Sequence, residues 1–170
     1  MNYILIGFMG CGKTTVGAEL ASRTGLNMID ADQEIERRQG EKISEMFEKR
    51  GEDFFRNLET RLLREYADAD HGCTGLVLSA GGGMPMKEEN RILMHRIGKI
   101  IYLRAEADTL EMRLKGDSSR PLLQKGDLRE RIETLMSQRQ AVYQTAADLC
   151  IDTDQLTPGQ VAEKILLHVM

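Results

Sequence analysis

The residues best suited to chemistry form one stretch near the start of the chain, GFMGCGKTT at positions 7–15. It matches the pattern G-x-x-x-x-G-K-S/T, whose backbone N–H groups turn inward around a polyphosphate. We expect Lys13 to reach the outer phosphates and the Thr14 hydroxyl to ligate Mg²⁺. The predicted nucleotide-binding residues of this stretch are Gly10, Cys11, Gly12, Lys13, Thr14 and Thr15.

Two carboxylates follow the second strand-like run, which covers residues 26–29. Phosphate-loop enzymes typically place a metal-side Asp at the end of an apolar strand, but the run at 75–79 ends in Ser79. We therefore assign Asp30 to the metal side and Asp32 to the hydroxyl that accepts the phosphoryl group. The simpler interpretation of this pair is a turn that caps a helix.

A loop and a glycine triplet complete the candidates. Residues 116–125 are rich in Gly, Ser, Asp and Lys and predict a mobile loop, in which Arg120 is placed to close on phosphates and exclude water. Solvated loop arginines are equally common. The glycine triplet, Gly81 to Gly83, lets backbone approach a small ligand, although a plain turn also fits.

The elements that position these residues alternate between strands and helices. Strands are predicted at 3–6, 26–29, 75–79, 100–103 and 149–151, and helices at 15–23, 33–39, 43–50, 88–96, 108–115 and 127–147, with a long helix around 55–66 and another from Thr157. This alternation predicts a three-layer α/β/α fold, in which a five-stranded parallel sheet has helices on both faces. Ligands of such folds bind at the carboxyl ends of the strands.

Composition narrows the class of protein. A chain of 170 residues suits one domain, residues 1–170, and its net charge of -4 offers no basic field for nucleic acid. The three cysteines, Cys11, Cys73 and Cys150, show no disulfide or zinc spacing. With no predicted membrane span or targeting segment, we expect a cytoplasmic protein that binds neither nucleic acid nor a membrane.

Taken together, these residues resemble one family, the shikimate kinases, which are small relatives of the nucleoside monophosphate kinases. The resemblance extends over almost the whole chain. It rests on GCGKTTVG at 10–17, DAD at 30–32, GEDFFR at 51–56 with Glu59, LSAGGG at 78–83, RPLL at 120–123, and Arg139 with Tyr143. It implies a P-loop kinase fold with a lid at 116–125. The implied reaction moves the γ-phosphoryl group of ATP to the 3-hydroxyl of shikimate, on the pathway to chorismate and aromatic amino acids.

The resemblance also implies roles for individual residues. Arg56 and Arg139 would bind the shikimate carboxylate, Asp32 would orient or deprotonate the attacking hydroxyl, and Gly82 would contact the same ligand. Glu59 would hold Arg56, within an acceptor-binding region at 32–63. On the nucleotide side, Arg120 would be the lid arginine, Arg113 would stack on adenine, and the loop 153–158 would border the adenine edge. The implied catalytic set is Asp32, Lys13 and Arg120, the cofactor is Mg²⁺, and the expected state is a monomer.

Two other functions and one open question accompany this interpretation. A kinase for gluconate or a nucleoside monophosphate shares the phosphate loop, but the DAD, FR and Arg139 set suits a hydroxylated carboxylate better. A nucleotide switch would leave the acceptor-side residues without a role.

Cys11, beside Lys13 at a helix N-terminus, is a candidate for oxidation or alkylation if it is exposed, and otherwise an inert loop residue.

Overall fold

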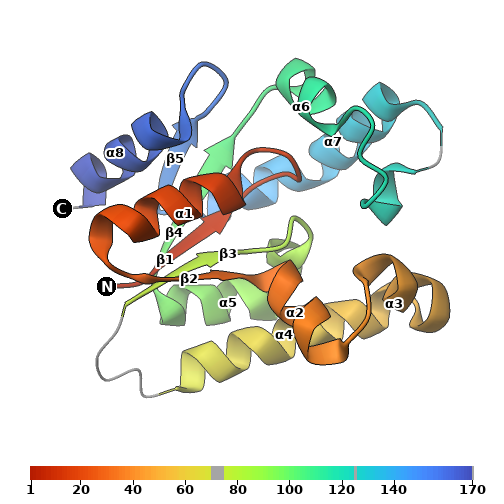
Figure 1. Ribbon diagram of the computed structural model, residues 1–170, viewed down its shortest axis with the longest axis horizontal. Helices are drawn as coiled ribbons and strands as arrows, with labels where there is room; N and C mark the ends of the chain where they lie inside the picture. Colours follow the sequence, from red (N-terminus) through yellow and green to blue (C-terminus); the bar gives the residue numbers. More distant parts are fainter. Residues whose placement is uncertain (70–74, 125, 170) are drawn as a thin grey trace.

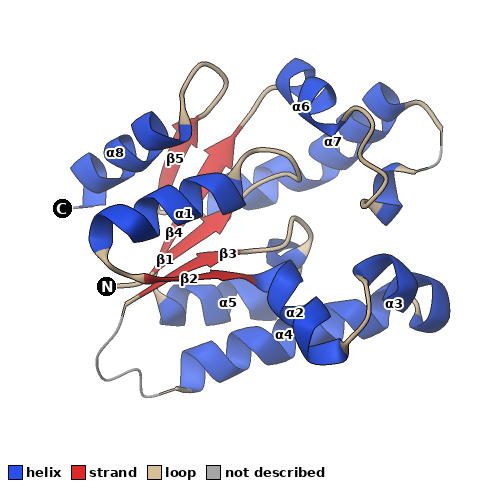
Figure 2. Cartoon of the chain, in the orientation of Figure 1, coloured by secondary structure: helices blue, strands red, loops and turns tan. Residues whose placement is uncertain are grey.

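The computed structural model describes residues 1–69, 75–124 and 126–169. Its five strands form one parallel sheet in the order β2-β3-β1-β4-β5, with helices on both faces (Figures 1 and 2). The predicted three-layer α/β/α fold is therefore confirmed. Cys73 and Lys125, the last residue of the predicted lid, lie outside the described residues.

The strands are β1 (Tyr3–Ile6), β2 (Asn27–Asp30), β3 (Leu76–Ser79), β4 (Lys99–Arg104) and β5 (Leu149–Asp152). The α-helices are α1 (Lys13–Thr24), α2 (Ala31–Gln39), α3 (Ile43–Arg50), α4 (Glu52–Asp68), α5 (Glu88–Ile97), α6 (Ala107–Leu114), α7 (Leu128–Ala146) and α8 (Pro158–Val169). There are two short 3-10 turns. The turn η1 (Met84–Met86) follows the glycine triplet, and the turn η2 (Pro121–Leu123) lies in the predicted lid.

The inner strands β1 and β3 are apolar apart from Ser79 at the end of β3, because helices cover both of their faces. Every residue of β1 and of β3 is buried, as expected for parallel strands between two helical layers. Helices α1 and α8 pack together on one face (Figure 1). Helices α5 and α7 contact strands from the other face, and α4 packs against α5. The sheet is thus a rigid support whose carboxyl edge carries the site.

The central strand β1 lies where the chain reverses its direction of travel across the sheet. From β1 the chain passes to β2 on one side, whereas β4 and β5 lie on the other side. Parallel sheets bind ligands beside such a point, at the carboxyl ends of the strands. The loop that leaves β1, residues 7–12, therefore occupies the position where the fold favours a ligand.

The strand register explains how Asp30 can take the metal side. Asp30 of β2 is paired with Ser79 of β3, and Ser79 is paired in turn with Leu5 of β1. Asp30 therefore stands level with the residue that would carry the usual carboxylate, one strand further from β1. This agrees with the reason for choosing it from the sequence.

One helix boundary changes the description of the two carboxylates. Helix α2 begins at Ala31 rather than Gln33, because Asp30 Oδ1 accepts a hydrogen bond from the Gln33 backbone N–H at 3.1 Å and caps the helix. Asp32 therefore lies in the first turn of α2. A helical position fixes its side chain more firmly than a loop would.

The predicted lid is partly ordered by its own contacts. Its turn η2 buries Leu123, and Arg131 of α7 donates two hydrogen bonds to the Leu122 carbonyl, at 2.8 and 3.2 Å. The predicted loop therefore contains a short 3-10 turn at residues 121–123, and its mobility stays a prediction. The Gly and Pro content that suggested a loop also suits a short 3-10 turn.

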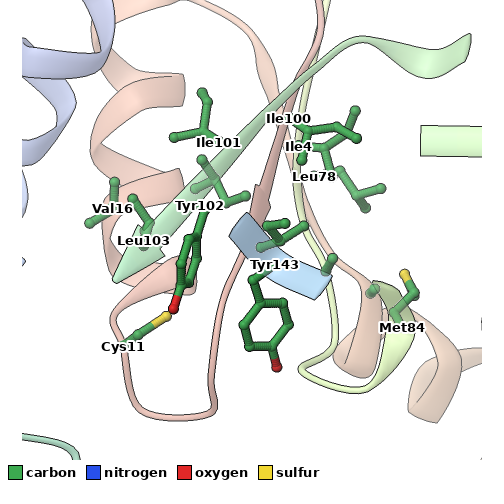
Figure 3. Packing of buried hydrophobic residues seen from close by; sticks show 14 of the residues in the cluster. Ile4, Cys11, Val16, Leu78, Met84, Ile100, Ile101, Tyr102, Leu103 and Tyr143 are labelled. Atoms are coloured by element: carbon green, nitrogen blue, oxygen red, sulfur yellow. The ribbon is translucent and has the colours of Figure 1, made fainter. Parts of the chain in front are cut away.

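Aromatic residues fill the core beneath the loop that follows β1. The rings of Tyr102 and Tyr143 lie 5.3 Å apart between centroids, and both side chains are buried (Figure 3). Tyr102 comes from β4 and Tyr143 from α7, so this contact ties the helix to the sheet. The carboxyl edge under the site is thereby joined to α7.

Candidate functional site

The loop that leaves β1 has the backbone geometry of a phosphate cradle. Gly10 and Gly12 have φ angles of +81° and +99°, which L side chains rarely adopt. Gly12 is the N-cap of α1 and supplies no side-chain cap. The first N–H groups of α1 are therefore available to an anion, and the helix dipole favours negative charge there.

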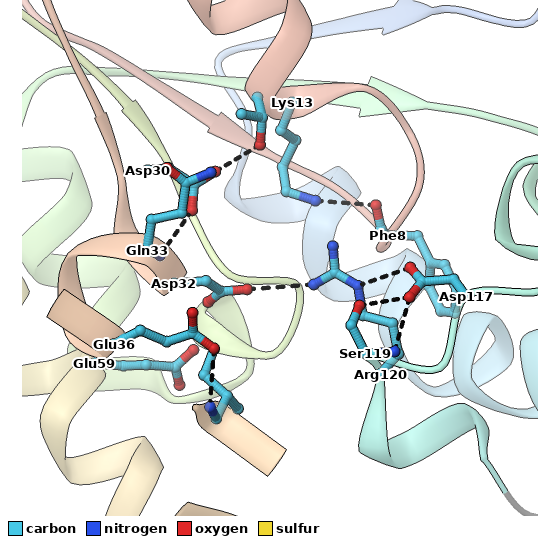
Figure 4. Close-up of polar contacts among 12 residues, drawn as sticks. Phe8, Lys13, Asp30, Asp32, Gln33, Glu36, Glu59, Asp117, Ser119 and Arg120 are labelled. Carbon is cyan, nitrogen blue, oxygen red and sulfur yellow. Dashed lines mark hydrogen bonds and ion pairs between the residues drawn. The ribbon is translucent and has the colours of Figure 1, made fainter. Parts of the chain in front are cut away.

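Lys13 lies across this loop. Its side chain is 9 % exposed, and Nζ donates to the backbone carbonyls of Gly7 and Phe8 at 2.9 and 3.0 Å (Figure 4). These bonds hold a full positive charge over the cradle. An anion bound there would meet the ammonium group without a large movement of the backbone.

Thr14 and Asp30 place two side-chain oxygens next to each other beside the cradle. The Thr14 hydroxyl donates to Asp30 Oδ2 at 2.5 Å, while Oδ1 of the same carboxylate caps α2. The helix cap expected from the simpler interpretation is therefore present at Oδ1, while the metal-side role of Asp30 stays a prediction. A hydroxyl and a carboxylate are the donors that Mg²⁺ prefers, and Mg²⁺ normally takes its remaining ligands from phosphates and water. The donor set fits this ion.

Asp32 lies deeper in the same cleft. Burial, followed by the neighbouring Asp30 carboxylate, raises the pKa of Asp32, while the charges of Arg120, Lys13 and Arg56 act in the opposite direction. A carboxylate with a raised pKa is a better proton acceptor than one on the surface. The environment therefore suits Asp32 to orient or accept a hydroxyl proton.

Arg56 is held by two carboxylates of its own helix, α4. Its Nη1 donates to Glu59 Oε2 at 2.9 Å, and its Nε and Nη2 donate to Glu52 Oε1 at 3.1 and 2.9 Å. Glu59 is fully buried, and this burial raises the pKa of Glu59 to about 7, although Arg56 opposes the rise. The predicted role of Glu59 as the residue that holds Arg56 agrees with these contacts.

The glycine triplet leaves room for the acceptor-side residues. A Cβ on Gly81 would lie 2.7 Å from Asp32 Oδ1 and 2.8 Å from Glu59 Oε1. A Cβ on Gly83 would overlap the Arg56 guanidinium. A side chain at Gly81 or Gly83 would therefore have to displace Asp32, Glu59 or Arg56, a close approach that the plain-turn interpretation does not explain.

Arg139 and Tyr143 approach the triplet from α7. Arg139 is 6 % exposed, and its Nη1 would lie 3.4 Å from a Cβ on Gly82. The Tyr143 hydroxyl donates to the Gly82 carbonyl at 2.5 Å. One turn of α7 thus brings a cation to the site and fixes the backbone beside it.

These residues line two adjoining cavities. The large cleft has a volume of about 840 Å³ and is lined by the cradle with Asp30, Arg113 and Thr153, among others. The small pocket, about 60 Å³, is lined by Arg56, Glu59, Arg139, the glycine triplet and the apolar side chains of Ile43, Phe47 and Phe55, among others. Asp32, Gly82 and Arg120 line both cavities. The structure therefore brings every predicted site residue to one continuous site.

Unpartnered polar atoms mark the small pocket as a binding site. Five buried side-chain polar atoms have no hydrogen-bond partner among the described residues, and four belong to this pocket: Asp32 Oδ1, Glu59 Oε1, Arg120 Nε and Arg139 Nη1. A buried polar group without a partner is costly and calls for an explanation. A ligand with hydroxyl and carboxylate groups would supply the missing bonds of Asp32, Glu59 and Arg139. Arg120 Nε instead has the Asp117 carboxylate 3.7 Å away.

The lid brings Arg120 to the border between the two cavities. Arg120 Nη1 donates to Asp32 Oδ2 at 3.5 Å, and Nε lies 3.7 Å from Asp117 Oδ2. Arg113 of α6 donates to the Gly10 carbonyl at 3.2 Å and lines the large cleft beside the cradle. Both arginines are therefore within reach of a ligand in the large cleft.

Sequence reasoning assigned no role to Glu52 or Tyr143, although both lie in motifs that it quoted. The spacing of Glu52 and Arg56, four residues apart on one helix, was a usable signal for their ion pair. The bond from Tyr143 to Gly82 joins positions 61 residues apart, so local sequence contains no sign of it.

Cys11 does not meet the condition for a reactive thiol. Its side chain is 1 % exposed and belongs to the buried cluster drawn in Figure 3. Its Sγ lies 3.8 Å from Lys13 Nζ. Oxidation and alkylation require access to the sulfur. The inert interpretation, a small residue that fills the underside of the loop, agrees with the structure.

Within residues 1–69, 75–124 and 126–169, no group of three or more His, Cys, Asp or Glu residues is arranged to hold a metal ion. None of the helices described here has the length and apolar character needed to cross a bilayer.

Comparisons with known proteins point to one family. The family model for shikimate kinase matches residues 9–170. The shikimate kinase of Chromobacterium violaceum is 43 % identical over 169 residues, covering 97 % of this chain and 90 % of that protein. The relative from Persephonella marina is 41 % identical, with 97 % and 96 % covered. The solved shikimate kinase of Acinetobacter baumannii in complex with shikimate superposes with a TM-score of 0.93 at 37 % identity, covering 99 % of this chain and 92 % of that one.

Proposed function

Because this chain belongs to the shikimate kinase family, we propose that it transfers the γ-phosphoryl group of ATP to the 3-hydroxyl of shikimate, giving shikimate 3-phosphate and ADP. The observation that carries the proposal is the pair of adjoining cavities, which share Asp32, Gly82 and Arg120. Each cavity holds one substrate, and their border is the place of transfer.

The large cleft takes ATP. Its cradle binds the phosphates through backbone N–H groups, and Lys13 neutralises the charge that moves during transfer. Arg113 and the loop 153–158 border the adenine. Thr14 and Asp30 would hold Mg²⁺, which supplies charge neutralisation and orientation of the phosphates when it is bound. Replacing Thr14 by Val should raise several-fold the Mg²⁺ concentration that gives half-maximal rate, and an unchanged requirement would remove Thr14 from this role.

The small pocket takes shikimate. Arg139 and Arg56 bind its carboxylate, because a planar guanidinium presents paired N–H donors to the two oxygens. The ring lies against the apolar side chains of the pocket, and Gly82 contacts the ligand through its backbone. The unpartnered atoms of Asp32 and Arg139 support this assignment, since they gain partners from the hydroxyl and carboxylate groups.

The reaction takes place at Asp32. Asp32 accepts a hydrogen bond from the 3-hydroxyl and directs its oxygen at the γ-phosphorus. The proton passes to this carboxylate or leaves with the product, while Lys13 and Arg120 stabilise the charge on the transferred group. Positioning supplies most of the acceleration, because a loose transition state requires little covalent assistance from the protein.

We further propose that residues 1–170 act as one kinase unit, with an acceptor-binding region at 32–63 and a lid at 116–125. A monomer would suffice, since one chain supplies every residue assigned above. A cytoplasmic location, without nucleic acid or membrane as partner, agrees with the supply of ATP and Mg²⁺ and with the net charge of -4.

The decisive experiment measures ADP formation with and without shikimate. We expect strong dependence on shikimate and a product that carries phosphate on the 3-oxygen. Quinate, gluconate and a nucleoside monophosphate serve as competing acceptors in parallel assays. Equal turnover without shikimate, or faster turnover with another acceptor, would overturn the proposal.

A further inference from the structure

Arg120 lies between two carboxylates that belong to different parts of the molecule (Figure 4). Asp32, from α2, accepts from Nη1 at 3.5 Å, and Asp117, three residues earlier in the lid, lies 3.7 Å from Nε. The two contacts therefore use different edges of the guanidinium, which carries its N–H groups in a fixed planar fork.

Asp117 is itself held firmly by the lid. Its Oδ1 accepts from the Ser119 backbone N–H at 2.8 Å and from the Ser119 hydroxyl at 2.5 Å. Its backbone N–H donates to the Leu114 carbonyl at 3.0 Å, at the end of α6. One carboxylate oxygen is thus committed to the turn, and Oδ2 is left to face Arg120.

Asp117 keeps its negative charge at neutral pH. The hydrogen bond from the Ser119 hydroxyl lowers the pKa of Asp117 most, and the Ser119 backbone N–H and the charge of Arg120 lower it further, against the effect of burial. The partner of Arg120 Nε is therefore a permanent anion on the same loop.

The two carboxylates have different duties under the proposed function, on which this inference rests. Asp32 must be free for the acceptor hydroxyl, so its contact with Arg120 has to be exchanged when the substrates bind. Asp117 is assigned no contact with either substrate, so its contact with Arg120 can persist during turnover. We propose that Asp117 is a positioning residue for phosphoryl transfer, which holds the Nε edge of Arg120 during turnover so that only the Nη edge passes from Asp32 to the phosphates.

Replacing Asp117 by Asn tests the proposal, because the amide oxygen can still accept both bonds from Ser119 while the charge is lost. A partly exposed ion pair is weak, so we expect kcat to fall about threefold to tenfold. The KM for shikimate should change less than twofold. The matched control is Asp127→Asn at the N-cap of α7, where Oδ1 accepts from the Glu130 backbone N–H at 2.9 Å. That variant should retain kcat within twofold.

A double-variant cycle separates positioning from a general structural effect. If Asp117 acts through Arg120, then Asp117→Asn in an Arg120→Ala background should leave kcat at the value of Arg120→Ala alone. If the double variant loses the same factor again, or if Asp117→Asn alone keeps the wild-type kcat, the inference is wrong. If kcat of Arg120→Ala is too small to measure, the same cycle is applied to the dissociation constant of Mg·ATP.

The outcome is distinguishable from failure of the proposed function. A wild-type protein that does not phosphorylate shikimate contradicts the proposed function, whatever Asp117 does. A wild-type protein that does so, together with an Asp117→Asn variant of unchanged kcat, contradicts only the positioning role.

Discussion

The large cleft and the small pocket are built in different ways. The large cleft takes its central part from one continuous stretch, residues 9–16, which runs from the loop after β1 into α1. The small pocket depends on side chains from α2, α4, α7 and the lid, which meet over the glycine triplet. A cradle of backbone needs only local geometry, whereas a pocket of charged side chains needs supports for each charge.

This difference shows which substitutions should disrupt each of the two cavities. Arg56 has two carboxylates as supports, and Glu59 among them has no exposure to solvent. Buried charges of this kind are stable only while their partners remain. Substitutions around the small pocket should therefore weaken the binding of shikimate and leave the binding of ATP unaffected. The following predictions test that separation.

The largest effect on kcat is expected at Asp32, on the border between the large cleft and the small pocket. Replacing Asp32 by Asn removes the proton acceptor but retains the shape of the side chain, so kcat should fall about 10²-fold to 10⁴-fold. Both KM values should change little, because neither substrate is bound mainly by this carboxylate. Steady-state kinetics with each substrate varied in turn gives these numbers. A near-normal kcat would show that Asp32 is not required in the transfer step.

The separation itself is tested at Arg56. Loss of its charge-assisted bonds in Arg56→Ala should cost about 1.5–3 kcal/mol, equivalent to roughly a 10-fold to 100-fold rise in the KM for shikimate. The KM for ATP should stay within about twofold. Arg64→Ala is the matched control, since Arg64 lies on the same helix in an exposed pair with Glu89. A larger change for ATP than for shikimate would contradict the assignment of the two cavities.

A smaller effect concerns stability and pH. The folded-state pKa of Glu59 is about 7, above its ordinary value of 4.5, so the folded protein retains a proton that the unfolded chain has already lost. The stabilisation is complete below about pH 4.5 and is lost as pH rises to about 7. Relative to Glu59→Gln, the wild type should therefore lose on the order of 1–3 kcal/mol of unfolding free energy over this range.

Urea unfolding between pH 5 and pH 8.5 measures this difference. Glu34→Gln is the control, because the hydrogen bond from Arg37 lowers the pKa of Glu34 to about 2, outside the window. Its difference from the wild type should stay constant over the range of the experiment. A flat curve for Glu59→Gln as well would mean that Glu59 does not titrate near neutrality.

The smallest effect is expected at Tyr143. Removing its hydroxyl in Tyr143→Phe deprives the Gly82 carbonyl of a donor and should cost about 1 kcal/mol of unfolding free energy. Because the triplet loses one support but no ligand contact, the KM for shikimate should rise less than about threefold. Thermal unfolding and acceptor kinetics, measured on the same preparation, test both values. A tenfold rise would indicate that the hydroxyl contacts the substrate directly.

The sequence allowed the sheet, its strand pattern and the phosphate loop to be predicted, because each depends on local pattern. It also placed Asp30 correctly, since the end of a strand can be read from the residues around it. The contact of Asp117 with Arg120 and the bond from Tyr143 to Gly82 could not be predicted, because side-chain direction in a lid and contacts between distant elements depend on the folded chain. The pairing of Arg56 with Arg139 at one carboxylate was predicted from the family resemblance, because the spacing of the two residues alone does not indicate that they lie together.

The glycine triplet has a consequence for inhibition. Two of its members have no free volume, because Gly81 faces Asp32 and Glu59 and Gly83 faces Arg56. Even alanine at either position would have to displace a side chain of the catalytic or binding set. A compound that presses against this wall of the small pocket therefore meets a surface that a substitution at Gly81 or Gly83 reshapes only by moving Asp32, Glu59 or Arg56. Resistance to such a compound would have to arise elsewhere, on the apolar side of the pocket or in the lid.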